Sequence, residues 1–203
     1  MDALSPADAR DLAIRPAAPD DFAGVCHLFR VLDEIHVRAR PDVFFDVPGD
    51  ARPRSYYDAI LADPDQTILV AEPPAEIAAK PEAKIDNGQL AGLVHVLLKV
   101  KANVDVPGVH PRTYGLINNL SVAPALRSRG IGRMLMAAGA AWAFERGATE
   151  LEIQVHEFNE RARALYERIG FVTSVRTMRL VPGQSPDQTP DEIRGVLADS
   201  DRR

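Results

Sequence analysis

The chain has 203 residues and a mass of 22.2 kDa, which suits one domain with a sizeable core, and its 46% hydrophobic and 26% charged residues are ordinary for a globular protein. A formal charge of −5 gives no reason to expect nucleic-acid binding. No run approaches the ~18 apolar residues of a membrane span, and the first residues lack the features of a signal peptide. We therefore expect a cytoplasmic protein. The single cysteine, Cys26, excludes an internal disulfide and a cysteine-based zinc site, and its apolar neighbours predict a packed thiol.

Periodicity and helix boundaries predict the elements of the first half of the chain. Residues 1–11 are expected to be a flexible N-terminus. After them we expect a strand at Leu12–Pro16, a helix from Pro19 to near Arg40, a helix at Arg54–Ala62, a strand at Thr67–Glu72 and a mobile insertion at residues 75–89.

The second half alternates strands and helices. We expect antiparallel strands at Leu90–Lys101 and Tyr114–Val122, and then a helix from about Ile131 that Gly147 ends, with Met134 and Trp142 in the core. After it we expect a strand at Leu151–Val155, a helix between its N-cap Asn159 and Gly170, one or two strands from Phe171 to Val181, and a tail at residues 182–203. This order predicts an α/β domain with a mixed, mostly antiparallel sheet flanked by helices.

A turn rich in glycine and arginine joins the strand that ends at Val122 to the following helix. Gly130 and Gly132 remove side chains where backbone must approach a ligand, and the helix start offers unpaired N–H groups to an anion. Arginine side chains around the turn favour a polyphosphate. Taken alone, such a turn is more often only a connection.

A second motif follows about thirty residues later. Asn159 stands at a helix N-cap position, Gly170 lies just past the helix end, and Tyr166 is seven residues after Asn159. At about 100° per residue, Asn159 and Tyr166 point nearly the same way from one helix face.

Together the two segments resemble the GNAT superfamily of acetyl-CoA-dependent N-acetyltransferases. The family's Arg/Gln-x-x-Gly-x-Gly/Ala motif is met by Arg127, Gly130 and Gly132. Its Asn-x-x-Ala-x-x-x-Tyr-x-x-x-Gly-Phe motif is met by Asn159, Ala162, Tyr166, Gly170 and Phe171. The resemblance is firm over residues 114–180 and implies a GNAT domain at residues 12–181 whose splayed central strands hold acyl-CoA.

The resemblance also implies roles for individual residues. Tyr166 would donate a proton to the departing CoA thiolate, and Asn159 would hydrogen-bond the pantetheine arm, although helix capping explains Asn159 equally well. The expected cofactor-binding residues are Leu120, Ser121, Val122, Arg127, Ser128, Arg129, Gly130, Ile131, Gly132, Arg133, Asn159 and Arg163; for Arg163 an ordinary surface position is the alternative. No metal is expected.

The general base is where this sequence departs from the family pattern. Some family members carry a glutamate on the strand equivalent to residues 114–119 or on the next strand, where this chain has no glutamate and Gln154, respectively. A water chain ordered by Asn118, Asn119 or Gln154 remains open, as does a side-chain base. The candidates for that base are Glu34, His36, His95, His156 and Glu157.

The sequence therefore predicts direct transfer of an acetyl group from acetyl-CoA, as co-substrate, to a primary amine of a small molecule or peptide. A protein N-terminal or lysine acetyltransferase and a non-catalytic acyl-CoA sensor are the alternatives; the missing strand carboxylate favours the sensor and Tyr166 favours catalysis. The acceptor, the preferred acyl group and the choice between monomer and homodimer stay open.

Overall fold

The computed structural model describes residues 12–73, 90–101 and 110–179. The chain divides into two compact units, Met1–Leu165 and Tyr166–Arg203. The N-terminal segment, the insertion and the tail expected at residues 1–11, 75–89 and 182–203 lie outside the described residues.

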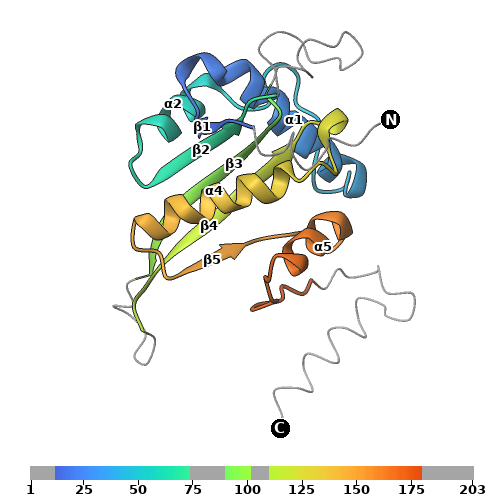
Figure 1. Ribbon diagram of the computed structural model, residues 1–203. Coiled ribbons are helices and arrows are strands. Elements are labelled where there is room, and N and C mark those ends of the chain that lie inside the picture. Colours follow the sequence, from blue (N-terminus) through green and yellow to red (C-terminus); the bar gives the residue numbers. More distant parts are fainter. Residues whose placement is uncertain (1–11, 74–89, 102–109, 180–203) are drawn as a thin grey trace, which may run out of the picture. The chain divides into compact units, whose positions relative to one another are not determined.

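The first unit is built on a five-stranded sheet in the order β1-β2-β3-β4-β5 (Figure 1). Its strands are β1 (Ile14–Pro16), β2 (Gln66–Ala71), β3 (Gly92–Lys101), β4 (Arg112–Val122) and β5 (Glu150–Ile153). The first three pairings are antiparallel, and β4 pairs parallel with β5. The predicted mixed, mostly antiparallel sheet is confirmed.

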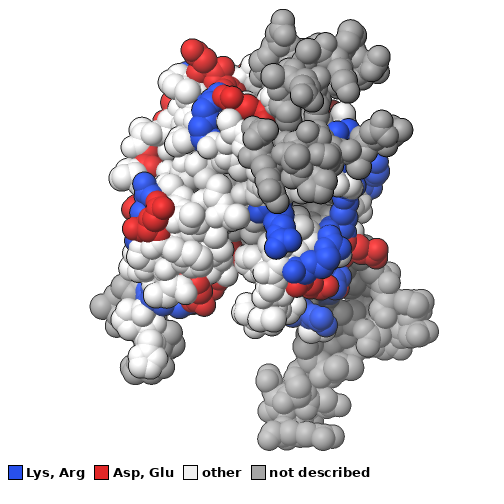
Figure 2. All heavy atoms as spheres, viewed as in Figure 1, with Lys and Arg blue, Asp and Glu red and all other residues white. Residues whose placement is uncertain are grey.

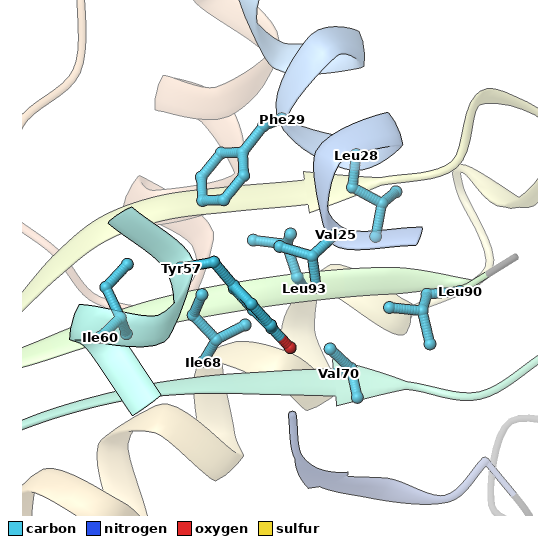
Figure 3. Packing of buried hydrophobic residues seen from close by; sticks show 9 residues of the cluster. All are labelled: Val25, Leu28, Phe29, Tyr57, Ile60, Ile68, Val70, Leu90 and Leu93. Atoms are coloured by element: carbon cyan, nitrogen blue, oxygen red, sulfur yellow. The ribbon is translucent and has the colours of Figure 1, made fainter. Parts of the chain in front are cut away.

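Two helices pack on one face of this sheet. These are α1 (Phe22–Ala39) and α2 (Arg54–Ala62). Their buried side chains meet alternate residues of β2 and β3 in one cluster (Figure 3), which contains Val25, Leu28, Phe29, Tyr57, Ile60, Ile68, Val70, Leu90 and Leu93. Cys26 is buried on α1 as predicted, and burial raises the pKa of its thiol.

The opposite face is covered by α4 (Ile131–Glu145), which runs along the sheet in Figure 1. The helix approaches β3 so closely that a Cβ at Gly139 would stand 2.9 Å from Val96 Cγ2. Gly139 and Ala143 therefore stand at the closest contact, while the bulky Met134 and Trp142, predicted to be core, are only half-buried. The Arg146 guanidinium instead covers the Trp142 ring, with Arg146 Cζ 4.5 Å from the ring centroid.

The last helix is α5 (Glu160–Arg168). The strands predicted after it are wrong for the described part of that segment, because Phe171–Arg179 forms no strand. A strand needs a partner for its backbone N–H and C=O groups. No strand within the described residues pairs with residues 171–179, and the apolar side chains Val172, Val175 and Met178 are exposed.

Within residues 12–73, 90–101 and 110–179, every helix is too short or too polar to span a membrane, and no group of three or more His, Cys, Asp or Glu side chains is arranged to hold a metal ion.

Candidate active site

The turn that links β4 to α4 has the backbone of an anion site. Ser128 and Gly130 both adopt positive φ, 64° and 85°, and Gly130 is the N-cap residue of α4. Its carbonyl accepts the N–H groups of Arg133 and Met134, which starts the helix. The described residues offer no acceptor to the N–H groups of Gly130, Ile131 and Gly132. These donors and the positive end of the α4 dipole are available to an anion.

Gly132 is not required by the fold. A Cβ added there would lie 3.5 Å from Leu165 Cδ2 and 3.8 Å from Val122 Cγ2, which are ordinary van der Waals distances. Glycine inside a helix costs about 0.5–1 kcal/mol relative to alanine. A glycine that the protein's own packing does not demand fits a position where a ligand approaches the backbone.

Positive charge accumulates around this turn. Arg127 donates from Nε to the Val122 carbonyl oxygen at 3.1 Å, and Arg161 donates from Nη2 to Ser128 Oγ at 3.0 Å. Burial and then the nearby Arg161 charge lower the pKa of Arg127. Figure 2 shows Lys and Arg side chains gathered over the start of α4 and the first half of α5. No ion pair within the described residues involves any of Arg127, Arg129, Arg133 and Arg161.

The structure distinguishes Arg161 from Arg163, which the sequence had suggested for the cofactor. Arg163 donates to Glu157 Oε1 at 2.6 Å, so its charge is paired within its own segment. Arg161 was missed by sequence reasoning. Arg161 and Leu165 are four residues apart and therefore share one face of α5. The sequence does not say which face of α5 lies beside the turn; the structure does, because Leu165 is the residue nearest to Gly132.

The strand before the turn has an edge without a strand partner. β5 pairs with residues 114–117 only, whereas β4 continues to Val122. Among the described residues no strand pairs with Leu120, Ser121 or Val122 on that side. The Ser121 side chain is already used, because its hydroxyl donates to the Leu28 carbonyl at 2.8 Å, so only the backbone is available for a ligand.

Irregular pairing marks the place where β4 and β5 part. His95 pairs with Asn119 and Val96 pairs with Ile117, which leaves Asn118 as an extra residue in β4. Such a bulge bends its strand and changes the direction of a side chain. Asn118 is exposed at this point.

Helix α5 begins and ends as the motif predicts. Asn159 Oδ1 accepts from the Ala162 N–H at 3.2 Å, which is an N-cap bond. At the other end Gly170 has φ 102°, and the Phe171 N–H donates to the Tyr166 carbonyl at 3.0 Å. The Phe171 ring thereby lies 6.0 Å from that of Tyr166. Burial raises the pKa of Tyr166 to about 12, so its phenol stays protonated at neutral pH.

Two of the candidate bases lie in a cluster of four rings. The His156 ring stacks on Phe158 with centroids 5.0 Å apart and meets the His36 ring at 5.2 Å, while Phe44 packs against both histidines. Partial burial, and next the His36 charge, lower the pKa of His156. Its imidazole is therefore mostly neutral at pH 7 and able to accept a proton.

The other candidates have different surroundings. Glu34 and Gln154 are exposed, and Glu157 is paired with Arg163. His95 is only 1% exposed on β3, and burial lowers its pKa to about 4. It lies on the sheet face that carries α1 and α2, hydrogen-bonded to Asn118 at the bulge.

The family model described as "Acetyltransferase (GNAT) family" matches residues 32–171. A relative from Bacillus subtilis (strain 168), the uncharacterized N-acetyltransferase YhfO, is 27% identical over 158 residues, which cover 78% of this chain and 88% of that protein. Streptothricin acetyltransferase of Streptomyces lavendulae is 46% identical over 55 residues, 27% of this chain and 29% of that one.

Solved structures share the fold. A crystal structure of the BH1408 protein from Bacillus halodurans matches with a TM-score of 0.72 and 24% identity, covering 83% of this chain and 98% of that chain. Aminoglycoside N-acetyltransferase AAC(6')-Iy in complex with CoA matches with a TM-score of 0.58 and 15% identity, covering 83% and 98%. With both motifs and the family model in agreement, the chain belongs to the GNAT acetyltransferase family and is an acyltransferase of the N-acetyltransferase type.

Proposed function

We propose that this protein transfers the acetyl group of acetyl-CoA directly to a primary amine on a small molecule or peptide. The observation that carries the proposal is the turn at residues 127–133. Its free N–H groups, its unpaired arginines and a helical glycine that the fold does not need all suit a bound pyrophosphate.

The pyrophosphate would be held by the backbone of Gly130, Ile131 and Gly132, with arginine side chains around it. Arg127, Ser128, Arg129 and Arg133 belong to the same turn, and Arg161 is added to them because it reaches Ser128. The pantetheine arm would pair with the free backbone edge of Leu120–Val122, as an added strand pairs with a sheet edge. Asn159 keeps its capping role, and its amide nitrogen remains for a contact with pantetheine.

The reaction needs a neutral amine, stabilisation of a tetrahedral oxyanion and a proton for the leaving thiolate. The amine nitrogen attacks the thioester carbonyl, the C–N bond forms and the C–S bond breaks. The nitrogen loses one proton, and the thiolate gains one to give free CoA. Tyr166 is proposed as the donor of that proton, supported by its family position and by a phenol that burial keeps protonated. His156 and an ordered water remain candidates for the base.

A small-molecule acceptor is favoured over a protein acceptor by the similarity to an enzyme named for streptothricin. A non-catalytic sensor is disfavoured because the buried Tyr166 and its Gly170–Phe171 support are all present.

The test measures CoA thiol release from acetyl-CoA with polyamines, aminoglycosides, amino acids, arylamines and peptides, and confirms each hit by product mass. A product heavier by one acetyl group supports the proposal and identifies the acceptor class. Acetyl-CoA binding, measured by calorimetry, without turnover on any amine would support the sensor. No acetyl-CoA binding would refute the assigned cofactor site.

A further inference from the structure

A chain of hydrogen bonds crosses the sheet from the end of α2 to the bulge in β4. Gln66 Nε2 donates to Asp63 Oδ2 at 2.6 Å, and Gln66 Oε1 lies 3.1 Å from His95 Nε2. On the other side of the imidazole, His95 Nδ1 lies 3.2 Å from Asn118 Nδ2, which also donates to Asn119 Oδ1 at 3.1 Å. The five residues come from the α2–β2 turn and from strands β2, β3 and β4.

The carboxylate at one end sets the direction of every bond in this chain. The Gln66 hydrogen bond lowers the pKa of Asp63, which is therefore ionised at neutral pH and can only accept. Gln66 must turn its NH₂ group toward Asp63, so its oxygen faces His95. His95 then carries its proton on Nε2, and its bare Nδ1 accepts from the NH₂ group of Asn118.

Both N–H groups of Asn118 are thus used inside the protein, on His95 and Asn119. Its Oδ1 has no hydrogen-bond partner within the described residues, although the side chain is exposed. This oriented acceptor stands one residue beyond Ile117, the last residue of β4 that pairs with β5. It therefore lies where the strands part and where the proposed acyl group would lie.

We infer that Asn118 Oδ1 is a binding site for the acceptor amine and that His95 is a positioning residue that keeps this oxygen turned outward. The inference rests on the proposed function. The amine donates an N–H to Oδ1 while its lone pair stays free to attack, and the oxygen faces the positive charge that develops on nitrogen. An asparagine takes no proton, so its role is to hold and orient a primary amine.

The experiment titrates n-butylamine into protein saturated with CoA and follows the side-chain amide signals by NMR. Asn118→Leu is expected to weaken butylamine binding by roughly tenfold, because the amine N–H loses its hydrogen-bond acceptor. Asn118→Asp keeps an acceptor oxygen and should retain butylamine binding. CoA affinity, measured separately by calorimetry, should stay within about twofold in both variants because neither change touches the α4 turn.

The positioning role is tested at Asp63, the partly exposed residue at which the series of hydrogen bonds begins. Asp63→Asn keeps the shape of the side chain but introduces an NH₂ group that can donate a hydrogen bond. The side chains of Gln66, His95 and Asn118 are then no longer held in one orientation. The ¹⁵N shifts of His95 should change from the Nε2–H tautomer to a mixture, and butylamine binding should weaken. Asp65→Asn is the matched control, because it removes the same charge two residues away. The Asp65 side chain makes no hydrogen bond within the described residues, and it is the Asp65 backbone N–H that donates to Asp63 Oδ1.

The outcomes separate the two proposals. If the unaltered protein does not bind CoA, the proposed cofactor site is overturned and this inference with it. CoA binding with no butylamine shift, or equal butylamine affinity in Asn118→Leu, overturns the amine site alone. An unchanged His95 tautomer in Asp63→Asn overturns the positioning role.

Discussion

Replacing Gly132 with alanine should make the protein more stable and its cofactor binding weaker. The substitution relieves the backbone entropy cost of glycine in a helix, which is about 0.5–1 kcal/mol. The new methyl group would meet Leu165 Cδ2 at 3.5 Å and Val122 Cγ2 at 3.8 Å without overlap. Nothing in the described structure opposes the change, so the free energy of unfolding should rise by several tenths of a kcal/mol.

The same methyl group would stand where the pyrophosphate must approach the backbone. We expect acetyl-CoA affinity to fall by about tenfold, which corresponds to about 1.4 kcal/mol. Urea unfolding and calorimetric titration on the same preparations would measure the two effects. Greater stability together with unchanged acetyl-CoA affinity would refute the assignment of this turn to the pyrophosphate.

Gly139→Ala is the matched control on the same helix. Its Cβ would stand 2.9 Å from Val96 Cγ2 inside the contact between α4 and the sheet. Overpacking costs about 1–3 kcal/mol, which exceeds the gain in helix propensity. This variant should lose stability while acetyl-CoA affinity stays nearly constant, the reverse of Gly132→Ala.

Three other predictions test separate parts of the site. Tyr166→Phe should lower kcat by tenfold or more, as is usual for loss of a general acid, while calorimetry finds acetyl-CoA affinity unchanged; equal kcat would refute the acid role. The pKa of His95 falls from 6.5 to about 4 on folding, so its stabilising contribution is complete above about pH 6.5 and decreases by about 3 kcal/mol as the pH falls to about 4. Urea unfolding should show a shallower acid-side loss in His95→Gln, and identical pH slopes would contradict the buried neutral imidazole. Arg161→Ala should reduce acetyl-CoA affinity several-fold and weaken its salt dependence, whereas Arg146→Ala, at the other end of α4, should change neither; equal effects of the two changes in calorimetry would exclude a specific role for Arg161.

The helices were predicted closely because their signals are local. Prolines before Arg54 and after Ala62 bound α2 at the predicted residues, and Asn159 with Gly170 bounds α5. The core face of α4 was predicted less well. The helix carries apolar residues nearly all round, and the choice between Trp142 and Ala143 as the buried side chain depends on how closely the helix approaches Gly115 and Val96.

The sequence by itself determined the family and the order of the elements as far as α5, and it located the turn that we propose for the pyrophosphate. Each of these depends on residue types at fixed short spacings, where glycine, proline and capping residues act on their own backbone. Only the tertiary structure decided that Arg161 of α5 lies beside the turn, where it contacts Ser128. It also decided that Asn118 is the extra residue of the β4 bulge and ends a series of hydrogen bonds that begins at Asp63. Those features depend on side chains brought together across strands, over as many as 55 positions between Asp63 and Asn118 (118 − 63). Strand register and a single bulge bring them together, and no local pattern records either one.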